Sequence, residues 1–129
     1  MKLLLDTHAF IWIGGPEAHR LSANARRAVE DRTNEILVSA ASAWEIATKH
    51  RLGRLAAGER VVRRWSEALS GLRALDLAVT SEHGLLAGSL DSPHRDPFDR
   101  ILAAQAIVEG AQLVTADRAM HGLGASILW

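Results

Sequence analysis

A short apolar run near the start of the chain ends abruptly in an acid, and this run constrains the fold most. In Lys2–Leu5 a lysine is followed by three leucines, and Asp6 comes directly after them. Continuous apolar runs of this kind suit strands that are covered on both faces, as in parallel sheets. Similar runs recur along the chain. The further predicted strands are Ile36–Val38, Ala74–Leu77, Gln112–Thr115 and Ser126–Leu128.

The segments between these runs carry helix signals. Ser22 and Thr80 are of the residue types that cap helix starts, and Gly53 and Gly110 are of the type that ends helices. The predicted helices are Phe10–Ile13, one that follows Ser22, Ser42–Leu52, Glu59–Ser70, one that follows Thr80, and one from Asp96-Pro97 to Gly110. Because strands alternate with helices, the sequence predicts an α/β fold with a mostly parallel sheet. A length of 129 residues predicts a single domain, 1–129.

Composition narrows the class of protein. The chain has no cysteine, which excludes disulfides and thiolate metal sites and fits a reducing cytoplasm. The apolar run before Asp6 is too short for a signal peptide, and no stretch is long enough to span a membrane. We therefore expect a cytoplasmic protein that makes no use of a membrane. Basic and acidic residues are equal in number, 15 each, so overall charge does not indicate nucleic acid. A local site can still be basic on a neutral protein.

Four acids stand where such a sheet would bring them together. In open α/β sheets ligands bind beyond the carboxyl ends of the strands. Asp6 ends the first predicted strand, and Asp117 follows a late one. Glu45 and Asp99 lie on helices next to strands. A set of carboxylates without a histidine or cysteine ligand pattern favours Mg²⁺ or Mn²⁺. The chemistry that follows is attack of a metal-bound water on a phosphodiester.

Each acid also has a structural interpretation. Asp96 with Asp99 matches a pair at the start of a helix, and Ser42 with Glu45 matches the S-x-x-E capping box. Asp117, which follows the late strand, could begin a turn. Asp6 is the hardest to explain structurally, because no arginine lies near it in the sequence and a buried unpaired carboxylate is costly. The joint pattern therefore carries the catalytic hypothesis.

A basic stretch lies beside the second acid. Lys49–Arg73 holds seven lysines and arginines against two glutamates. Lys49, Arg51 and Arg54 could follow an RNA backbone, and the alternative is a solvated helix face whose charges pair with one another. Trp44 and Trp65 are expected to pack rather than to stack on bases.

Four motifs in order make the sequence recognisable. They are LLLDTHAFIW at Leu3–Trp12, SAWEIATKHRLGRL at Ser42–Leu55, RDPFDRILAAQA at Arg95–Ala106 and LVTAD at Leu113–Asp117. Together they resemble PIN-domain proteins of the VapC type, the toxin half of a type II toxin–antitoxin pair. The resemblance spans essentially the whole chain. It implies a three-layer α/β/α fold with a central, mostly parallel sheet, and a Mg²⁺- or Mn²⁺-dependent ribonuclease. It also implies a homodimer and inhibition by a cognate antitoxin.

The resemblance also assigns roles. The four family acids, which bind metal and act in catalysis, match Asp6, Glu45, Asp99 and Asp117. Asp96 is interpreted as a helix cap that supports the site, with direct metal ligation as the alternative. Thr115 matches the hydroxyl that the family places near the fourth acid.

Two other functions remain open at this point. One is a phosphatase-like hydrolase with Asp6 as nucleophile, because an aspartate at the end of the first strand suits that role. It is weakened because the second acid expected two residues further on is replaced by His8. The other is a non-catalytic PIN domain that binds RNA or a protein, and the presence of all four acids argues against it.

Overall fold

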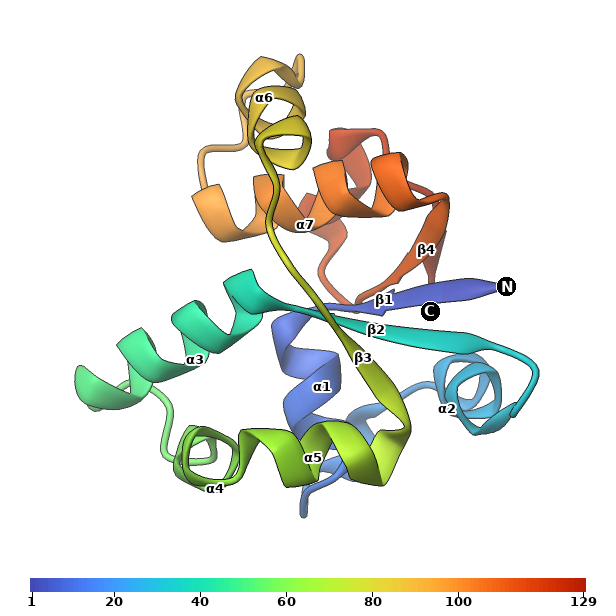
Figure 1. The fold of residues 1–129 in the computed structure, drawn as a ribbon, viewed down its shortest axis with the longest axis vertical. Coiled ribbons are helices and arrows are strands. Elements are labelled where there is room, and N and C mark those ends of the chain that lie inside the picture. The colour runs from blue at the N-terminus through green and yellow to red at the C-terminus, as the bar shows by residue number, and fades with distance from the viewer.

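Five parallel strands form one sheet in the order β3-β2-β1-β4-β5 (Figure 1). The computed structural model describes residues 1–129. The strands are β1 Lys2–Leu5, β2 Glu35–Ser39, β3 Ala74–Leu77, β4 Ala111–Val114 and β5 Ile127–Leu128. In the central strand, Leu5 lies opposite Val38 on one side and Val114 on the other. The expected parallel sheet is confirmed, with every pairing parallel.

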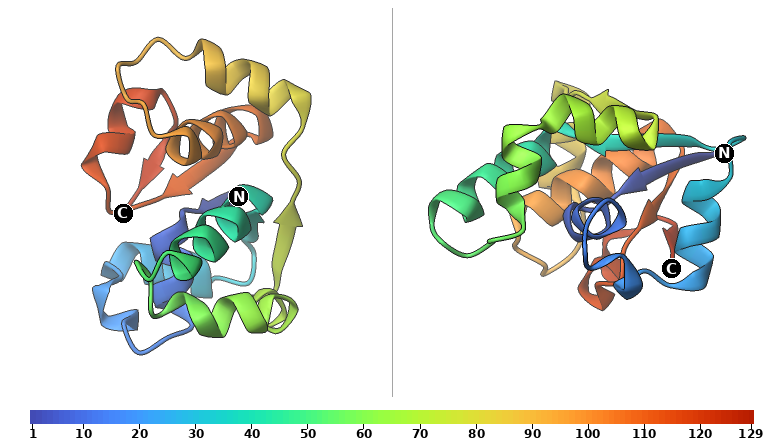
Figure 2. Two further views of the ribbon diagram at one scale, coloured as in Figure 1. Left: turned by 90° about the vertical axis from the view of Figure 1, so that its left-hand side faces the viewer. Right: turned by 90° about the horizontal axis from the view of Figure 1, so that it is seen from below.

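Helices cover both faces of this sheet. They are α1 Thr7–Ile13, α2 Ala23–Glu30, α3 Ala40–Arg51, α4 Gly58–Arg63, α5 Trp65–Leu72, α6 Ser81–Ser89 and α7 Pro97–Glu109, with short 3₁₀ helices at Ala18–Arg20 and Arg118–Leu123. Figure 1 shows α1, α2, α4 and α5 on one face and α7 on the other, with α6 packed outside α7. A quarter turn shows the same layers (Figure 2). This is the expected three-layer α/β/α arrangement. No helix has both the length and the apolar character needed to cross a membrane.

The leucines of β1 supply both cores. Successive strand residues point to opposite faces, so Leu3 and Leu5 pack with Phe10 under α1, whereas Leu4 packs with Leu102 of α7. All three leucines of the strand are fully buried. Because β1 lies at the centre of the molecule, the residue that follows it emerges in the middle of one edge of the sheet.

The start and end of α7 follow the sequence signals. The Asp96 carboxylate accepts hydrogen bonds from the backbone N–H groups of Phe98 (2.9 Å) and Asp99 (3.2 Å), and Pro97 occupies the first turn. Gly110 ends the helix in the left-handed region, with φ of 64°. These contacts fix Asp99 in the first turn of a helix whose middle is buried.

Two helix starts differ from the predictions. Helix α1 begins at Thr7 instead of Phe10, because the Asp6 carboxylate accepts the N–H of Ala9 at 2.7 Å and so caps the helix directly after the strand. Helix α3 begins after Ser39, whose hydroxyl caps it, so the predicted capping box at Ser42 is wrong.

The predicted helix Glu59–Ser70 is also wrong, because the chain forms two helices there. The backbone breaks at Arg64, with φ of −132° and ψ of 46°. The break turns the chain so that α4 packs on α3 while α5 runs along β3 (Figure 1). Helix α5 passes through Gly71 and ends before Arg73, which adopts φ of 55°. Trp65 is partly buried and packs against the core as expected, edge-on to Phe10 with ring centroids 5.2 Å apart.

Candidate active site

The acids that the sequence singles out meet around one small cavity of about 90 Å³ beside the carboxyl end of β1. The cavity is lined by Asp6, Thr7, His8, Glu45, Lys49, Asp96, Asp99, Leu102 and Asp117. These residues come from α1, α3, α7 and the segment after β4, together with the caps of α1 and α7. Parallel strands place their carboxyl ends at one edge, which is why residues far apart in the sequence meet here.

Asp6 is a buried carboxylate with a structural bond as well as a place in the cavity. The residue is 8% exposed, and its Oδ1 accepts the Ala9 N–H. Burial raises the pKa of the Asp6 carboxyl above its ordinary value. Hydrogen bonds from Thr115 and Ala9 and the charge of His8 lower it, and repulsion from Glu45 raises it further. The cost of removing the carboxylate from water therefore exceeds the stabilisation that its partners give to the ionised form. The negative charge of Asp6 is not fully compensated.

Glu45 has a partner for each carboxylate oxygen. The Thr7 hydroxyl donates to Oε1, and the Lys49 ammonium pairs with Oε2 one helical turn further on. The Thr7 hydroxyl oxygen is also within hydrogen-bond distance, 3.1 Å, of the hydroxyl of Ser42, which is buried beside it. Lys49, predicted as an RNA contact, therefore faces the acids of the cavity. Thr7 was missed by sequence reasoning, and its only signal was its position directly after Asp6.

Asp99 is held from a neighbouring loop. His94 Nε2 lies 2.7 Å from Asp99 Oδ2. Burial raises the pKa of the Asp99 carboxyl, the His94 hydrogen bond and charge lower it, and repulsion from Asp96 and Glu45 raises it. The ionised carboxylate is therefore under-compensated here too, although a ring nitrogen lies within hydrogen-bond distance.

The loop that carries His94 is fixed by one arginine. The Arg100 guanidinium donates to four backbone carbonyls, those of Ala87 (2.9 Å), Leu90 (2.7 Å), Ser92 (3.1 Å) and His94 (2.8 Å). Arg100 directly follows Asp99, so one turn of α7 supplies both the acid and the group that anchors the partner of that acid. Sequence reasoning missed this role, because nothing in the sequence shows which carbonyls an arginine will reach.

Asp117 completes the cavity from an exposed position. Its carboxylate accepts the N–H of Ala119 at 2.9 Å, and its own N–H donates to the Thr115 hydroxyl at 3.0 Å. Thr115 is fully buried and is also a hydrogen-bond partner of Asp6. It therefore links the first and the last acids of the cavity.

The donor set fits a hard divalent cation. As the side chains stand, no three histidine or acidic side chains are close enough together to hold an ion. The carboxylates of Asp6 and Asp99 nevertheless have raised pKa values, and Lys49 neutralises Glu45 alone. Under-compensated oxygen donors around a cavity of this size suit Mg²⁺ or Mn²⁺, which prefer such ligands and keep part of their water shell.

Other predicted residues lie away from the cavity. Arg51 and Arg54 are exposed and do not line it. Trp44 was expected to pack, but its residue is 65% exposed and only its edge contact with Phe98, at 4.8 Å between ring centroids, holds it. The expectation for Trp44 is wrong because α7 reaches it through Phe98 and still leaves most of the residue open to solvent.

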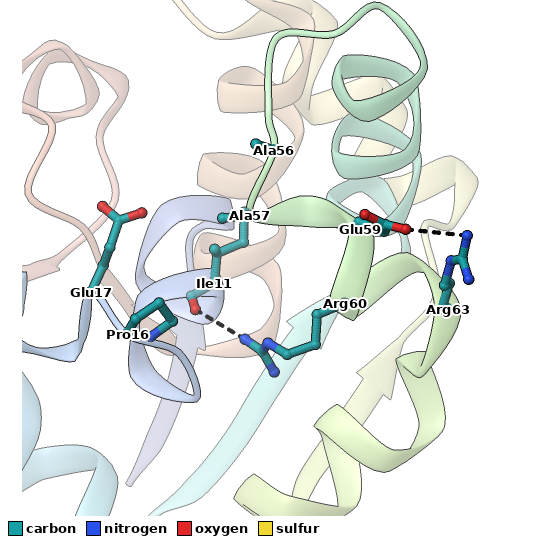
Figure 3. Close-up of a pocket in the computed structure, with 8 residues that line it drawn as sticks. All are labelled: Ile11, Pro16, Glu17, Ala56, Ala57, Glu59, Arg60 and Arg63. Atoms are coloured by element: carbon teal, nitrogen blue, oxygen red, sulfur yellow. Dashed lines mark hydrogen bonds and ion pairs between the residues drawn. The ribbon is translucent and has the colours of Figure 1, made fainter.

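A different cavity, of about 400 Å³, lies between the end of α1 and α4 (Figure 3). Arg60 spans it and donates to the carbonyl of Ile11 at 3.5 Å, while Glu59 pairs with Arg63 at 3.1 Å. None of the acids that the sequence singles out lines this cavity. The acids that the sequence singles out therefore line the smaller cavity, which we call the acid cavity, and not this one.

Comparison with known proteins agrees with this geometry. The model of the PIN domain matches residues 3–125. This chain belongs to the PIN domain family. The PIN domain is 34% identical over 125 residues to Ribonuclease VapC22 of Mycobacterium tuberculosis (strain ATCC 25618 / H37Rv), covering 92% of this chain and 89% of that relative. It is 50% identical to Ribonuclease VapC16 of the same organism over 54 residues, 38% of each chain.

A solved structure shares the fold of this PIN domain. It is the crystal structure of VapBC2 from Rickettsia felis bound to a DNA fragment from their promoter, with a TM-score of 0.70 and 19% sequence identity. The match covers 100% of this chain and 98% of that chain. The resemblance to VapC-type PIN domains is therefore confirmed, and so is the expected fold.

Proposed function

We propose that this PIN domain is an endoribonuclease of the VapC type, which hydrolyses phosphodiester bonds in RNA. The observation that carries the proposal is the convergence of Asp6, Glu45, Asp99 and Asp117 on one cavity of a PIN fold. Similarity to Ribonuclease VapC22 over nearly the whole chain supports it.

The same four acids would hold Mg²⁺ or Mn²⁺. When bound, the metal supplies an activated water and stabilises negative charge on the leaving oxygen. The chain supplies rigid placement of the donors. The N–H of Ala9 holds Asp6, and the Thr7 hydroxyl holds Glu45. The Oδ1 of Asp96 accepts the N–H groups at the start of α7 and so supports Asp99.

The RNA backbone would be guided by basic residues of α3 and the loop after it. Lys49 lies at the cavity, paired with Glu45, where its ammonium can exchange that partner for a phosphate. Arg51 and Arg54 are exposed further along the same helix and loop and extend the positive charge away from the acids. These three residues are proposed as phosphate contacts, not as readers of sequence.

We also infer that the chain works as a single domain in the cytoplasm, as a homodimer that a cognate antitoxin protein inhibits. The VapC names of its relatives and the VapBC2 assembly of its structural neighbour support this inference.

Cleavage of total cellular RNA by the purified chain, followed by mapping of the new ends, tests the proposed activity. We expect cleavage with Mg²⁺ or Mn²⁺ and none with EDTA. Asp76→Asn, which replaces an exposed aspartate of β3 by its amide, should cleave like wild type. Undiminished cleavage in EDTA would exclude the metal mechanism, and intact RNA under every metal condition would exclude the ribonuclease.

A further inference from the structure

A second cavity adjoins the acid cavity and shares residues with it. It has a volume of about 320 Å³ and is lined by Asp6, His8, Trp12, Arg20, Ala116 and Asp117. Asp6, His8 and Asp117 also line the acid cavity, so the two spaces meet along these residues. We call this space the Trp12 cavity. Whatever occupies it lies directly beside the acids.

The walls of the Trp12 cavity are flat and fixed in place. The Trp12 ring is half-buried, with the Trp129 ring edge-on to it at 6.2 Å and the His8 ring tilted against it at 5.7 Å. The central carbon of the Arg20 guanidinium lies 4.5 Å from the centroid of the Trp12 ring. These contacts place the guanidinium over the tryptophan ring and the imidazole at an angle to it, with all three groups lining one space.

Arg20 keeps unused hydrogen-bond donors beside the cavity. Its Nη1 donates to Glu17 at 2.7 Å, and neither of its other two guanidinium nitrogens has a partner within the protein. Contact with the tryptophan ring orders the guanidinium before any ligand arrives. A pre-ordered guanidinium with free donors is well suited to a phosphate oxygen.

We propose that the Trp12 cavity is a subsite for one nucleotide of the RNA, next to the phosphodiester held at the acids. The base packs against the surfaces that His8, Trp12 and Arg20 leave open to the cavity, and the free donors of Arg20 bind a flanking phosphate. Unpaired RNA bases are bound in this way on aromatic rings and guanidinium planes. The inference rests on the proposed ribonuclease function and adds to it the residues that place the substrate.

Size and position support one nucleotide at this place. The volume of the Trp12 cavity is at the lower end of the range of roughly 300–1,000 Å³ for small-molecule sites, enough for one base and its sugar. The cavity between α1 and α4 is larger but has no aromatic ring and no residue in common with the acid cavity (Figure 3).

Steady-state cleavage of a short RNA tests the subsite through Trp12. Trp12→Leu keeps an apolar side chain but loses the ring face. We expect its KM to rise roughly tenfold or more, the size of one lost base stack, with a smaller change in kcat. Trp12→Phe keeps an aromatic face and should recover most of the loss. Trp44→Leu, which removes an exposed tryptophan that lines neither cavity, should leave KM unchanged.

Arg20 gives a second variant that does not disturb the core, because its side chain is exposed. Arg20→Gln should weaken binding of a labelled RNA octamer in EDTA and reduce the salt dependence of that binding by about one phosphate contact. Arg20→Lys should keep the salt dependence but recover only part of the affinity, because lysine has no planar group to stack.

RNA octamers in which one nucleotide lacks its base test whether a base occupies the Trp12 cavity. An abasic nucleotide at one position should weaken binding to wild type and have little further effect on Trp12→Leu. Equal abasic losses in both proteins would overturn the subsite, as would folded Trp12→Leu and Arg20→Gln variants with wild-type KM. A loss in Trp44→Leu instead would place the base on the other side of the acids. A wild type that neither binds nor cleaves RNA would overturn the proposed function itself, and the subsite with it.

Discussion

At the scale of single residues, Asp6 and Asp99 couple the site to the stability of the fold. Burial raises the pKa of both carboxyls, and like charges add to the rise. A carboxyl whose pKa is higher in the folded than in the unfolded state destabilises the fold when it is ionised. This penalty fades as pH falls through the raised value and is gone below the unfolded value.

The metal-free protein should therefore melt at a higher temperature in mild acid than at neutral pH. Asp6→Asn should melt above wild type in EDTA at neutral pH and gain less on acidification, because asparagine keeps the cap on α1 without the charge. Asp31, whose pKa is lowered by hydrogen bonds from Thr33, gives the control. Asp31→Asn should show the same rise in melting temperature in mild acid as wild type. An Asp6→Asn variant that melts below wild type in EDTA would contradict this prediction.

Replacement by asparagine should affect Asp96 and Asp99 differently. Asp99→Asn should abolish cleavage and leave the far-ultraviolet circular dichroism spectrum unchanged. Asp96→Asn should cleave at a reduced rate, since asparagine also caps helices. RNA cleavage assays on both variants decide between the two assignments. An inactive Asp96→Asn with an active Asp99→Asn would show that the third acid is Asp96.

At the scale of elements, the stability that the Ser39 cap gives to α3 can be measured separately from the effect of Ser42, which lies beside the site. Ser39→Ala removes the hydroxyl that accepts the N–H of Ala41, and should lower the free energy of unfolding by about 1 kcal/mol in a urea titration. Ser42→Ala should cost less, because Thr7 keeps its hydrogen bond to Glu45. A larger loss in Ser42→Ala would contradict the observed start of the helix.

The sequence predicted several of the elements that local chemistry decides. The leucine run of β1 and the Asp96-Pro97 start of α7 depend on neighbouring residues, and both are found as expected. The convergence of the acids could be inferred because parallel strands share an edge. The break at Arg64 could not, since the apolar stripe through Trp65 runs on unbroken, and the turn there depends on how α4 and α5 pack. The Lys49–Glu45 pair is local, because the two residues are four apart on α3. The Trp12 cavity, in contrast, depends on tertiary packing.

At the scale of the whole molecule, the proposed activity predicts toxicity. The wild-type chain expressed alone should arrest growth, because it would degrade RNA in the cell. Asp99→Asn, expressed to the same level, should not. Growth curves with matched protein levels measure the difference, and Asp76→Asn serves as the control for a changed surface charge. An Asp99→Asn chain that arrests growth as strongly as wild type would show that toxicity does not come from catalysis.

The position of β1 has a consequence for the time at which the site forms. Strand β1 precedes β2 and β4 in the sequence but lies between them in the sheet, and the Asp6 N–H donates to the carbonyl of Val114 at 3.0 Å. A growing chain can pair β1 on only one side until Ala111–Val114 has left the ribosome, and Asp117 comes later still. Pairings so distant along the sequence form late in folding. A ribosome that stalls before Ala111 therefore holds a chain with a half-paired central strand and an incomplete set of acids, so the proposed nuclease activity can begin only after Asp117 has been synthesised.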